Sequence, residues 1–303
     1  MEKLDFKPVS PDTAEAVYQY TSAFGEGSCQ HSPVSMFSYF EKYGDSFCIE
    51  DGFLYVLRSH LCDEDNRVYM APFGSGDLKQ AYERILSDAH AYDKKAKFYT
   101  LTKKHADFLE KEFPGVFEII YDRDLAEYIY SVNTMLEFPG KVHARRRTEI
   151  RSFWRDYGER VTVELLDPAK VDEVLAFAEY WMRENSETHD EEALQREMTC
   201  IRRQIDNFDR LSITGTVIRM DGKIKAFCYG TPLNEEYYDV LIEKGDRQLP
   251  GIYRVLRQES TKLNLGGFSY INFEEDLGVP GLRRVKESYG PAFMIEKYKV
   301  REK

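Results

Sequence analysis

Ionisable side chains gather near the C-terminal end of this 303-residue chain. The consecutive acids Glu274, Glu275 and Asp276 are followed by Arg283 and Lys286, and then by a tyrosine. Carboxylates close to cations and a phenol are typical of sites where protons move or charged groups bind, because each group shifts the pKa of its neighbours. This segment is therefore the first candidate for a functional site.

Acyl transfer from an ester, which the family resemblance described below implies, is a reaction that these side chains could support. The acceptor must be oriented or deprotonated, the tetrahedral oxyanion stabilised and the leaving hydroxyl protonated. We assign Asp276 to orienting or deprotonating the acceptor, with Glu275 as a second catalytic carboxylate. Lys286 would stabilise the oxyanion or bind a phosphate, and Tyr289 would protonate the leaving group. The structural alternatives are a helix cap for Asp276, surface charge for Lys286 and a packing anchor for Tyr289.

Two predicted strands position these candidates. The apolar run Tyr270–Phe273 leads directly into the acids, and a short helix over Leu282–Tyr289 carries the cations. A second strand, Tyr237–Glu243, precedes a glycine turn and a helix that begins at Ile252, and a helix N-terminus can hold an anion. On the family resemblance described below, Glu243 at the end of this strand could bind the amine of an aminoacyl group. The predicted substrate-binding residues are Glu243, Lys244, Gly251, Tyr253, Asn272 and Arg283.

A basic amphipathic helix is predicted between the two halves of the chain. It follows the break at Pro139-Gly140 and ends near Tyr157, and Ile150 and Phe153 begin an apolar face at helical spacing. The opposite face is rich in cations, which indicates either a contact for phosphates or an ordinary solvated surface. The candidate phosphate contacts are Lys141, Arg145, Arg147 and Arg151, and the family resemblance described below makes the same residues candidate contacts with tRNA.

One order of elements occurs twice along the chain: a hairpin, a strand, a glycine loop, a helix, a strand, a helix and a strand. Asp51-Gly52 and Asp221-Gly222 each lie between strand-like runs, which is a strong signal for a two-residue hairpin turn. We therefore predict an α/β (α+β) protein of two tandem domains, each a mixed sheet flanked by helices. The first would span residues 1–137. The second, residues 138–303, would contain the basic helix and the candidate site.

Several segments carry motifs that point to one family. They are Gly140–Phe153, Gly222–Phe227, Ile242–Asp246 with Gly251–Tyr253, Tyr270–Gly278 and Gly281–Tyr289. Together they resemble the DUF2156 family, which is related to the C-terminal domain of phosphatidylglycerol lysyltransferases. The resemblance implies two tandem GNAT-like domains (the acyl-CoA N-acyltransferase fold) of the Fem type, and an acyltransferase that takes an aminoacyl group from charged tRNA. The implied acceptor is a hydroxyl or an amine on a small molecule, a lipid headgroup or a peptide.

Two rival functions remain open. An acyl-CoA-dependent N-acyltransferase would need free backbone N–H groups between Lys244 and Gly251, where Pro250 lacks one. A non-catalytic binding protein could keep the same fold, because fold does not fix function. The resemblance requires no cofactor, and the donor would be aminoacyl-tRNA or, for the first rival, acyl-CoA.

Composition limits the class of protein. With 42% hydrophobic residues the chain should fold, and its net charge of −11 argues against a general nucleic-acid binder while leaving a local basic face open. No apolar run approaches the ~18 residues of a membrane span, and the N-terminus lacks a signal-peptide core. Five cysteines without a Cys-x-x-Cys pair, and histidines without metal-ligand spacing, predict a cytoplasmic protein with reduced thiols and no metal. The oligomeric state is not determined by the sequence.

Overall fold

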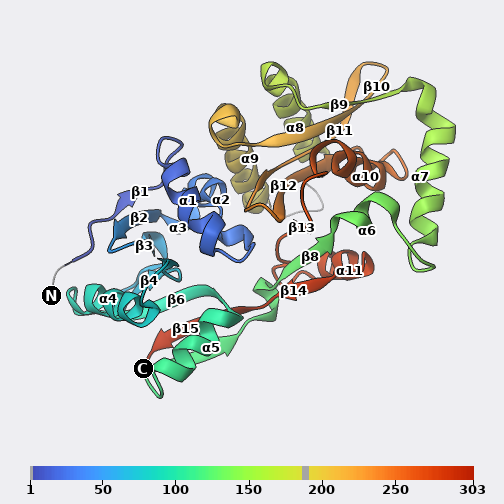
Figure 1. The fold of residues 1–303 in the computed structure, drawn as a ribbon. Coiled ribbons are helices and arrows are strands. Elements are labelled where there is room, and N and C mark those ends of the chain that lie inside the picture. The colour runs from blue at the N-terminus through green and yellow to red at the C-terminus, as the bar shows by residue number, and fades with distance from the viewer. Residues whose placement is uncertain (1–2, 186–190) are drawn as a thin grey trace. The chain divides into compact units, whose positions relative to one another are not determined.

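The computed structural model describes residues 3–185 and 191–303. The chain divides into two compact units, each built from separated segments (Figure 1). The first contains the described residues up to Tyr128 together with Glu274–Ser288 and Phe293–Lys303. The second contains the described residues of Ile129–Phe273 together with Tyr289–Ala292. These units group the acid-rich C-terminal segment with the N-terminal half of the chain, and the predicted boundary between residues 137 and 138 stays a prediction.

The first unit contains a mixed sheet in the order β1-β2-β3-β4-β6-β15-β7, with β5 paired to β3. β4 and β6 run parallel, and the other neighbours run antiparallel. The strands are β1 (Lys7–Pro8), β2 (Asp45–Glu50), β3 (Phe53–Arg58), β4 (Asn66–Tyr69), β5 (Phe73–Gly74), β6 (Lys95–Thr102), β7 (Phe117–Tyr121) and β15 (Lys297–Glu302). The helices are α1 (Ala14–Phe24), α2 (Pro33–Ser38), α3 (Phe40–Tyr43), α4 (Leu78–His90), α5 (Lys103–Glu112) and α11 (Pro280–Ser288).

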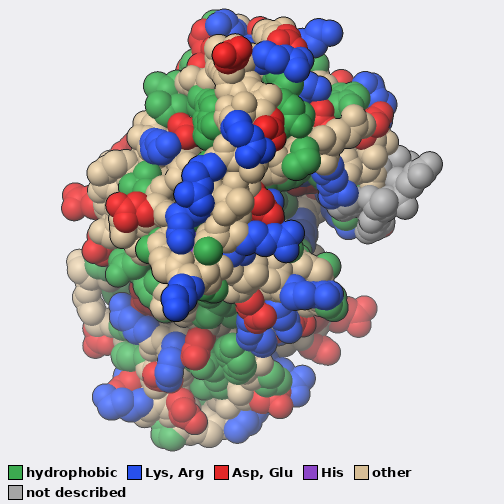
Figure 2. Space-filling view, turned by 90° about the vertical axis from the view of Figure 1, so that its right-hand side faces the viewer, with side chains coloured by type: hydrophobic (Ala, Val, Ile, Leu, Met, Phe, Trp, Pro, Cys, Tyr) green, Lys and Arg blue, Asp and Glu red, His purple; other side chains and the backbone are tan. Residues whose placement is uncertain are grey.

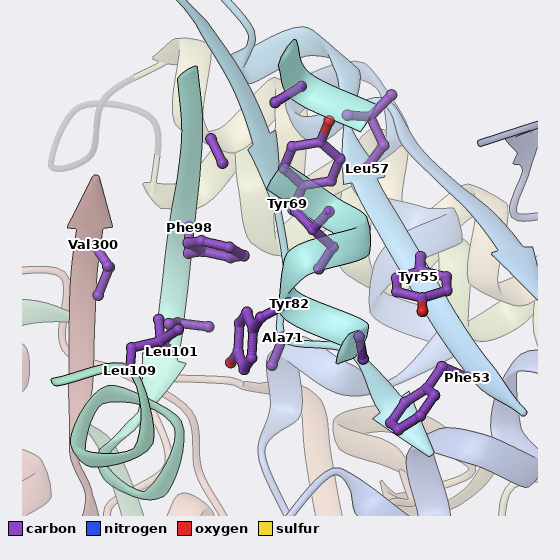
Figure 3. Packing of buried hydrophobic residues seen from close by; sticks show 14 of the residues in the cluster. Phe53, Tyr55, Leu57, Tyr69, Ala71, Tyr82, Phe98, Leu101, Leu109 and Val300 are labelled. Atoms are coloured by element: carbon purple, nitrogen blue, oxygen red, sulfur yellow. The ribbon is translucent and has the colours of Figure 1, made fainter. Parts of the chain in front are cut away.

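Side chains of β3 alternate between the two faces of this sheet, as in a strand buried on both sides. On one face Tyr55 packs in a cluster with residues of α4, α5 and β15 (Figure 3). On the other face Val56 packs with residues of α1 and α2. Helices therefore cover both faces of the sheet. The cluster on the first face includes Phe53, Leu57, Tyr69, Tyr82, Phe98, Leu109 and Val300.

The second unit contains another mixed sheet, in the order β8-β13-β12-β11-β10-β9. β12 and β13 run parallel, and the other neighbours run antiparallel. Helix α10 packs on β10, β11 and β12, and α8 packs on β11 and β12. Each unit is thus a mixed sheet flanked by helices, which confirms the predicted fold class. The elements are α6 (Val132–Glu137), α7 (Ala144–Tyr157), β9 (Val161–Leu165), α8 (Val171–Asn185), α9 (Glu191–Asp206), β10 (Thr214–Met220), β11 (Lys223–Pro232), β12 (Tyr237–Gly245), α10 (Ile252–Asn264) and β13 (Tyr270–Asn272).

Two further strands complete the chain. β8 (Glu127–Ser131) crosses from the first unit to the second after Tyr128, and β14 (Phe293–Ile295) follows the short segment that belongs to the second unit.

Both predicted hairpins are present. Two residues join β2 to β3 and β10 to β11, and Asp51, Gly52, Asp221 and Gly222 have φ values of 49°, 78°, 50° and 77°. Positive φ at both turn positions is the geometry that matches the twist of the flanking strands, and Asp-Gly adopts it readily.

Strands β12 and β13 part after a short pairing. Their register runs from Tyr237 opposite Tyr270 to Asp239 opposite Asn272, while β12 continues to Gly245. Helix α10 begins after Gly251, whose φ is 88°, and a Cβ there would lie 3.2 Å from the carbonyl oxygen of Glu149. A side chain at this position would be strained and crowded, so glycine permits this entry into the helix.

Candidate functional site

The acid-rich segment forms a tight loop in the first unit. Glu274 and Leu277 have φ values of 56° and 52°, which are uncommon for residues other than glycine. Tyr128 N donates to Glu274 O at 3.1 Å, and Leu277 N donates to Asp124 O at 3.0 Å. Between these two bends the side chain of Asp276 is fully buried.

The carboxylate of Asp276 accepts hydrogen bonds at both oxygens. Arg283 Nη2 and Gly278 N donate to Oδ1 at 2.8 and 2.9 Å. Arg283 Nε, Tyr128 Oη and Arg123 Nη1 donate to Oδ2 at 2.8, 2.6 and 3.2 Å. Burial by itself would raise the pKa of Asp276, but the hydrogen bonds from Arg283, Tyr128 and Gly278 hold that pKa well below its usual range. The group is therefore ionised at neutral pH, and both oxygens are occupied.

Two arginines connect Asp276 to its surroundings. Arg283 Nη2 also donates to Asp124 Oδ1 at 2.6 Å, and Arg123 Nη2 donates to Tyr128 Oη at 2.8 Å. Arg123, Asp124 and Tyr128 are not among the residues predicted from the sequence. They come from a short turn and the start of β8, with Arg123 153 positions before Asp276. No motif marks them, because only the fold brings them to the loop.

Lys286 and Glu275 lie beside this network. Lys286 Nζ donates to the backbone oxygen of Glu275 at 2.5 Å and lies 5.7 Å from the centre of the Tyr128 ring. The carboxylate of Glu275 accepts from Gln30 Nε2 at 3.3 Å and from Cys29 Sγ at 3.7 Å. The first unit thus brings together four predicted site residues: Glu275, Asp276, Arg283 and Lys286.

Glu243 belongs to the second unit and is already paired. Arg257, which the sequence analysis did not single out, donates Nη2 to Oε2 of Glu243 at 2.7 Å and Nε to Oε1 at 2.9 Å. Burial by itself would lower the pKa of Arg257, but Glu243 raises it above its usual value. A carboxylate held in this bidentate pair has little left to offer an amine, so the geometry disfavours the predicted contact of Glu243 with an aminoacyl group.

Tyr289 is packed between cations in the second unit. Its ring centre lies 4.1 Å from the guanidinium carbon of Arg146 and 4.4 Å from that of Arg257, and 6.1 Å from the ring of Phe138. The residue is only 5% exposed. These contacts fit the packing alternative, and a role for Tyr289 as proton donor stays a prediction.

Lys244 and Tyr253 surround the end of β12 together with Trp181. Lys244 Nζ pairs with Glu197 at 2.7 Å and lies 3.9 Å from the centre of the Trp181 ring. Trp181 Nε1 and Tyr253 Oη both donate to the carbonyl oxygen of Gly245 at 3.1 Å. The last carbonyl of β12 is therefore occupied by side chains of the same unit.

Four backbone N–H groups at the loop between β12 and α10 donate within the protein, namely those of Asp246, Gln248, Leu249 and Ile252. Asp246 N donates to Lys225 O at 2.8 Å, and Ile252 N donates to Leu249 O at 3.2 Å. Asp246 in turn accepts from Leu249 N at its carbonyl oxygen and from Gln248 N at Oδ1, at 3.0 and 2.9 Å. A phosphate-binding loop instead presents such groups to its ligand.

The other two predicted binding residues, Asn272 and Gly251, both have structural roles. Asn272 is fully buried in β13, in register with Ile129 of β8 and Asp239 of β12. Gly251 provides the positive φ that starts α10.

The predicted basic helix is α7, and its apolar face is buried at Ile150 and Phe153. Arg147 donates to the carbonyl oxygens of Phe138 and Gly140, so this side chain fixes the preceding turn. The other three candidates are exposed: Lys141 in the turn before the helix, Arg145 paired with Glu149 at 2.9 Å, and Arg151 donating to Thr148 Oγ1 at 3.4 Å. Figure 2 shows Lys and Arg side chains spread over one face of the molecule with acidic side chains among them.

Residues 26–301 match the family model described as the C-terminal domain of phosphatidylglycerol lysyltransferase. The chain belongs to this family. A curated relative, an uncharacterised protein of Mycoplasmoides gallisepticum, is 22% identical over 184 residues. That match covers 61% of this chain and 58% of the relative, less than two thirds of its length.

Solved structures extend the likeness over nearly the whole chain. A conserved protein of unknown function from Bacteroides thetaiotaomicron is 28% identical with a TM-score of 0.91, covering 99% of this chain and 100% of that one. L-PGS from Bacillus licheniformis is 15% identical with a TM-score of 0.67, covering 98% and 93%. FemX is 10% identical with a TM-score of 0.66, covering 98% and 97%.

The fold is the tandem GNAT arrangement. A tandem GNAT protein from the clavulanic acid pathway aligns over 99% of this chain and 98% of its own, with 10% identity and a TM-score of 0.52. The predicted resemblance and fold are both confirmed by these matches. Within the described residues, none of the helices has both the length and the apolar character needed to cross a bilayer.

Proposed function

We propose that this protein is an aminoacyltransferase that moves an aminoacyl group from charged tRNA to a hydroxyl or amine acceptor. Membership of the phosphatidylglycerol lysyltransferase C-terminal family over residues 26–301 supports this class of reaction. The likeness to the folds of L-PGS and FemX is consistent with it. The acceptor would be a lipid headgroup, a peptide or a small molecule, and no cofactor would be required.

The choice of donor depends on one observation, the internally bonded loop between β12 and α10. Acyl-CoA would need the N–H groups of such a loop for its pyrophosphate. Here the N–H groups of Asp246, Leu249 and Ile252 donate to carbonyl oxygens of the protein, and Pro250 has none to offer. A charged tRNA makes no such demand on this loop, so the geometry supports aminoacyl-tRNA over acyl-CoA.

We infer that Asp276 positions cations and does not act as the general base. A base works best when its pKa lies near the working pH, whereas the pKa of Asp276 is held well below its usual range. Its carboxylate fixes Arg283 and Arg123, whose planar guanidinium groups are suited to phosphate or carboxylate oxygens. Lys286 lies beside them and remains our candidate for stabilising the oxyanion or binding a phosphate.

Binding of the purified protein to aminoacylated and deacylated tRNA across a salt series, with acetyl-CoA titrated in parallel, tests the proposal. We expect salt-dependent binding that prefers the charged tRNA, because phosphate contacts release counterions. Saturable acetyl-CoA binding without tRNA binding would contradict the proposal and favour the acyl-CoA reaction. Binding of neither donor would favour a non-catalytic protein.

A further inference from the structure

Glu275 differs from Asp276 and Glu243 because its carboxylate accepts hydrogen bonds from uncharged side chains. The residue is half-buried, and Gln30 Nε2 and Cys29 Sγ reach its two oxygens at 3.3 and 3.7 Å. In the described part of the chain, no Lys, Arg or His forms an ion pair with it, whereas Asp276 and Glu243 are each paired with arginine. A carboxylate has about four lone-pair positions, so room for further donors remains.

A buried ion pair fixes the segment that carries Cys29. Glu127 and Lys297 pair at 2.7 Å, and both side chains are 0% exposed. The carboxylate of Glu127 also accepts from Ser28 Oγ at 2.8 Å and from Cys29 N at 3.1 Å. The backbone beside Glu275 is therefore held by a charged group that solvent does not reach.

A second buried ion pair fixes Gln30. Arg58 and Asp45 lie 3.3 Å apart with exposures of 1% and 0%, and Arg58 Nη2 donates to Gln30 Oε1 at 3.1 Å. Because the guanidinium can only donate, the amide oxygen of Gln30 must face Arg58, and its NH₂ group then faces Glu275. The ring of Tyr43 packs 4.3 Å from the guanidinium carbon of Arg58 and holds it in place.

Burying these four charges is expensive. Removing ions from water costs several kcal/mol each, and a well-packed apolar group is often as stable or more stable. Each pair forms a hydrogen bond with one of the two residues that hold Glu275. This arrangement is expected when neighbouring residues orient a functional group.

We propose that Glu275 is the ligand for a primary ammonium group, with Gln30 and Cys29 as its positioning residues. The inference rests on the proposed aminoacyl transfer, in which such a group is present on the transferred amino acid and on an amine acceptor. An ammonium would supply the charge-assisted hydrogen bonds that the carboxylate lacks. The ion pairs Glu127–Lys297 and Arg58–Asp45 keep the carboxylate in position before the ligand arrives.

Calorimetric titration with four small amides tests this subsite. Lysinamide carries both an α-ammonium and a side-chain ammonium, alaninamide carries the first, Nα-acetyl-lysinamide carries the second, and N-acetylalaninamide carries neither. We expect the uncharged amide not to bind. The affinities of the two singly charged amides will show whether Glu275 binds the α-ammonium or the side-chain ammonium. Glu275→Gln should weaken the binding of the preferred amide at least about tenfold, because it removes the charge without changing the shape.

Matched variants separate a binding role from a structural one. Glu110→Gln removes an exposed carboxylate on α5 of the same unit and should leave the titration unchanged. Cys29→Ser keeps a donor to Glu275 and should retain binding, whereas Gln30→Leu removes one and should weaken it in a protein whose circular dichroism is unchanged. Equal binding by wild type and Glu275→Gln, or no ammonium-dependent binding by wild type, would overturn the subsite.

The result is separable from the test of the donor. Ammonium-dependent binding without recognition of charged tRNA would leave the subsite in place and contradict the proposed donor. Preference for charged tRNA that is unchanged in Glu275→Gln, with no ammonium-dependent binding of the amides, would leave the donor in place and contradict the subsite.

Discussion

Single charges in this protein take their roles from their partners. Asp276 and Glu275 are neighbours in the chain, yet one is saturated by two arginines and a phenol and the other accepts from an amide and a thiol. The first has the properties of a structural anchor for cations. The second has the properties of a ligand. Two adjacent carboxylates therefore have different surroundings, and we infer different roles for them.

Asp276→Asn should weaken both the fold and the reaction. The change leaves Arg283 and Arg123 without their carboxylate, and we expect the free energy of unfolding to fall by about 2 kcal/mol with a loss of activity. Asp107→Asn is the control, since it removes one exposed carboxylate paired with Lys103 and should change stability by less than about 1 kcal/mol. Urea denaturation of both variants measures the difference, and equal effects would contradict the anchoring role.

The pH dependence of stability follows from the same group. Asp276 has a lower pKa in the folded protein than the value of about 3.9 in an unfolded chain, so the folded state binds fewer protons. Its contribution to the free energy of unfolding is complete above about pH 5 and is lost progressively as the pH falls through the unfolded value and below it. Asp276→Asn should show a shallower acid decline than the wild type in denaturation measured between pH 5 and pH 2.5, and parallel curves would rule out this assignment.

At the scale of elements, the loop before α11 depends on backbone conformations that few residues accept. Gly278 has a φ of 74°, and a Cβ there would lie 2.8 Å from Asp124 Oδ2. Gly281, at the start of α11, has no atom within 4 Å of such a Cβ. Two glycines three residues apart thus have opposite tolerance for a methyl group.

Gly278→Ala should destabilise the first unit by about 1–3 kcal/mol and lower activity, because the methyl group meets both strain and the Asp124 carboxylate. Gly281→Ala should be neutral or stabilising by up to about 1 kcal/mol, since alanine restricts the unfolded chain. Thermal unfolding of the pair gives the comparison. A Gly278→Ala protein as stable as Gly281→Ala would show that the loop tolerates another conformation.

The cationic side chains of helix α7 differ in exposure and in their hydrogen-bond partners. Arg151 is exposed, whereas Arg147 fixes two carbonyl groups of the preceding turn. Arg151→Glu should reduce the slope of log affinity for tRNA against log salt by at least about 0.7 while the unfolding free energy stays unchanged. Arg147→Glu should lower stability as well, so a tRNA defect in that variant alone would not identify a contact. An unchanged slope in Arg151→Glu would support a solvated basic face.

At the scale of the whole molecule, the strands of the first unit do not follow one another in the sheet in the order in which they occur in the sequence. The last strand, β15, lies between β6 and β7 in the sheet of the first unit, and it also supplies Lys297 to the buried pair with Glu127. The N-terminal half of the chain therefore cannot complete its own sheet. Contacts of this kind link residues that lie more than half of the 303-residue chain apart.

A fragment of residues 1–137 should not fold cooperatively. It contains Glu127 without Lys297, and β6 and β7 would each lose a strand neighbour, leaving a buried charge unpaired and two edges open. Circular dichroism and urea denaturation of the fragment, beside the full chain, provide the measurement. A cooperative transition in the fragment would support the boundary predicted between residues 137 and 138.

Local patterns determined much of this protein from sequence. The Asp-Gly hairpins, the apolar face of α7 and the loop and helix of the C-terminal motif all follow from backbone preferences and periodicity within a few residues. The motifs also sufficed to identify the family. Each of these signals is local because hydrogen bonds in turns and helices join residues that are close in the chain.

Tertiary structure alone decided which charges are neutralised. Arg123 donates to Asp276, and Gln30 donates to Glu275. Arg257 forms an ion pair with Glu243. The spacing of these residues in the sequence does not predict any of the three contacts. The role of a carboxylate depends on burial and on the donors around it, and both are set by strands and loops that meet only after folding. For this reason the sequence located the acids, while the fold separated the anchor Asp276 from the candidate ligand Glu275.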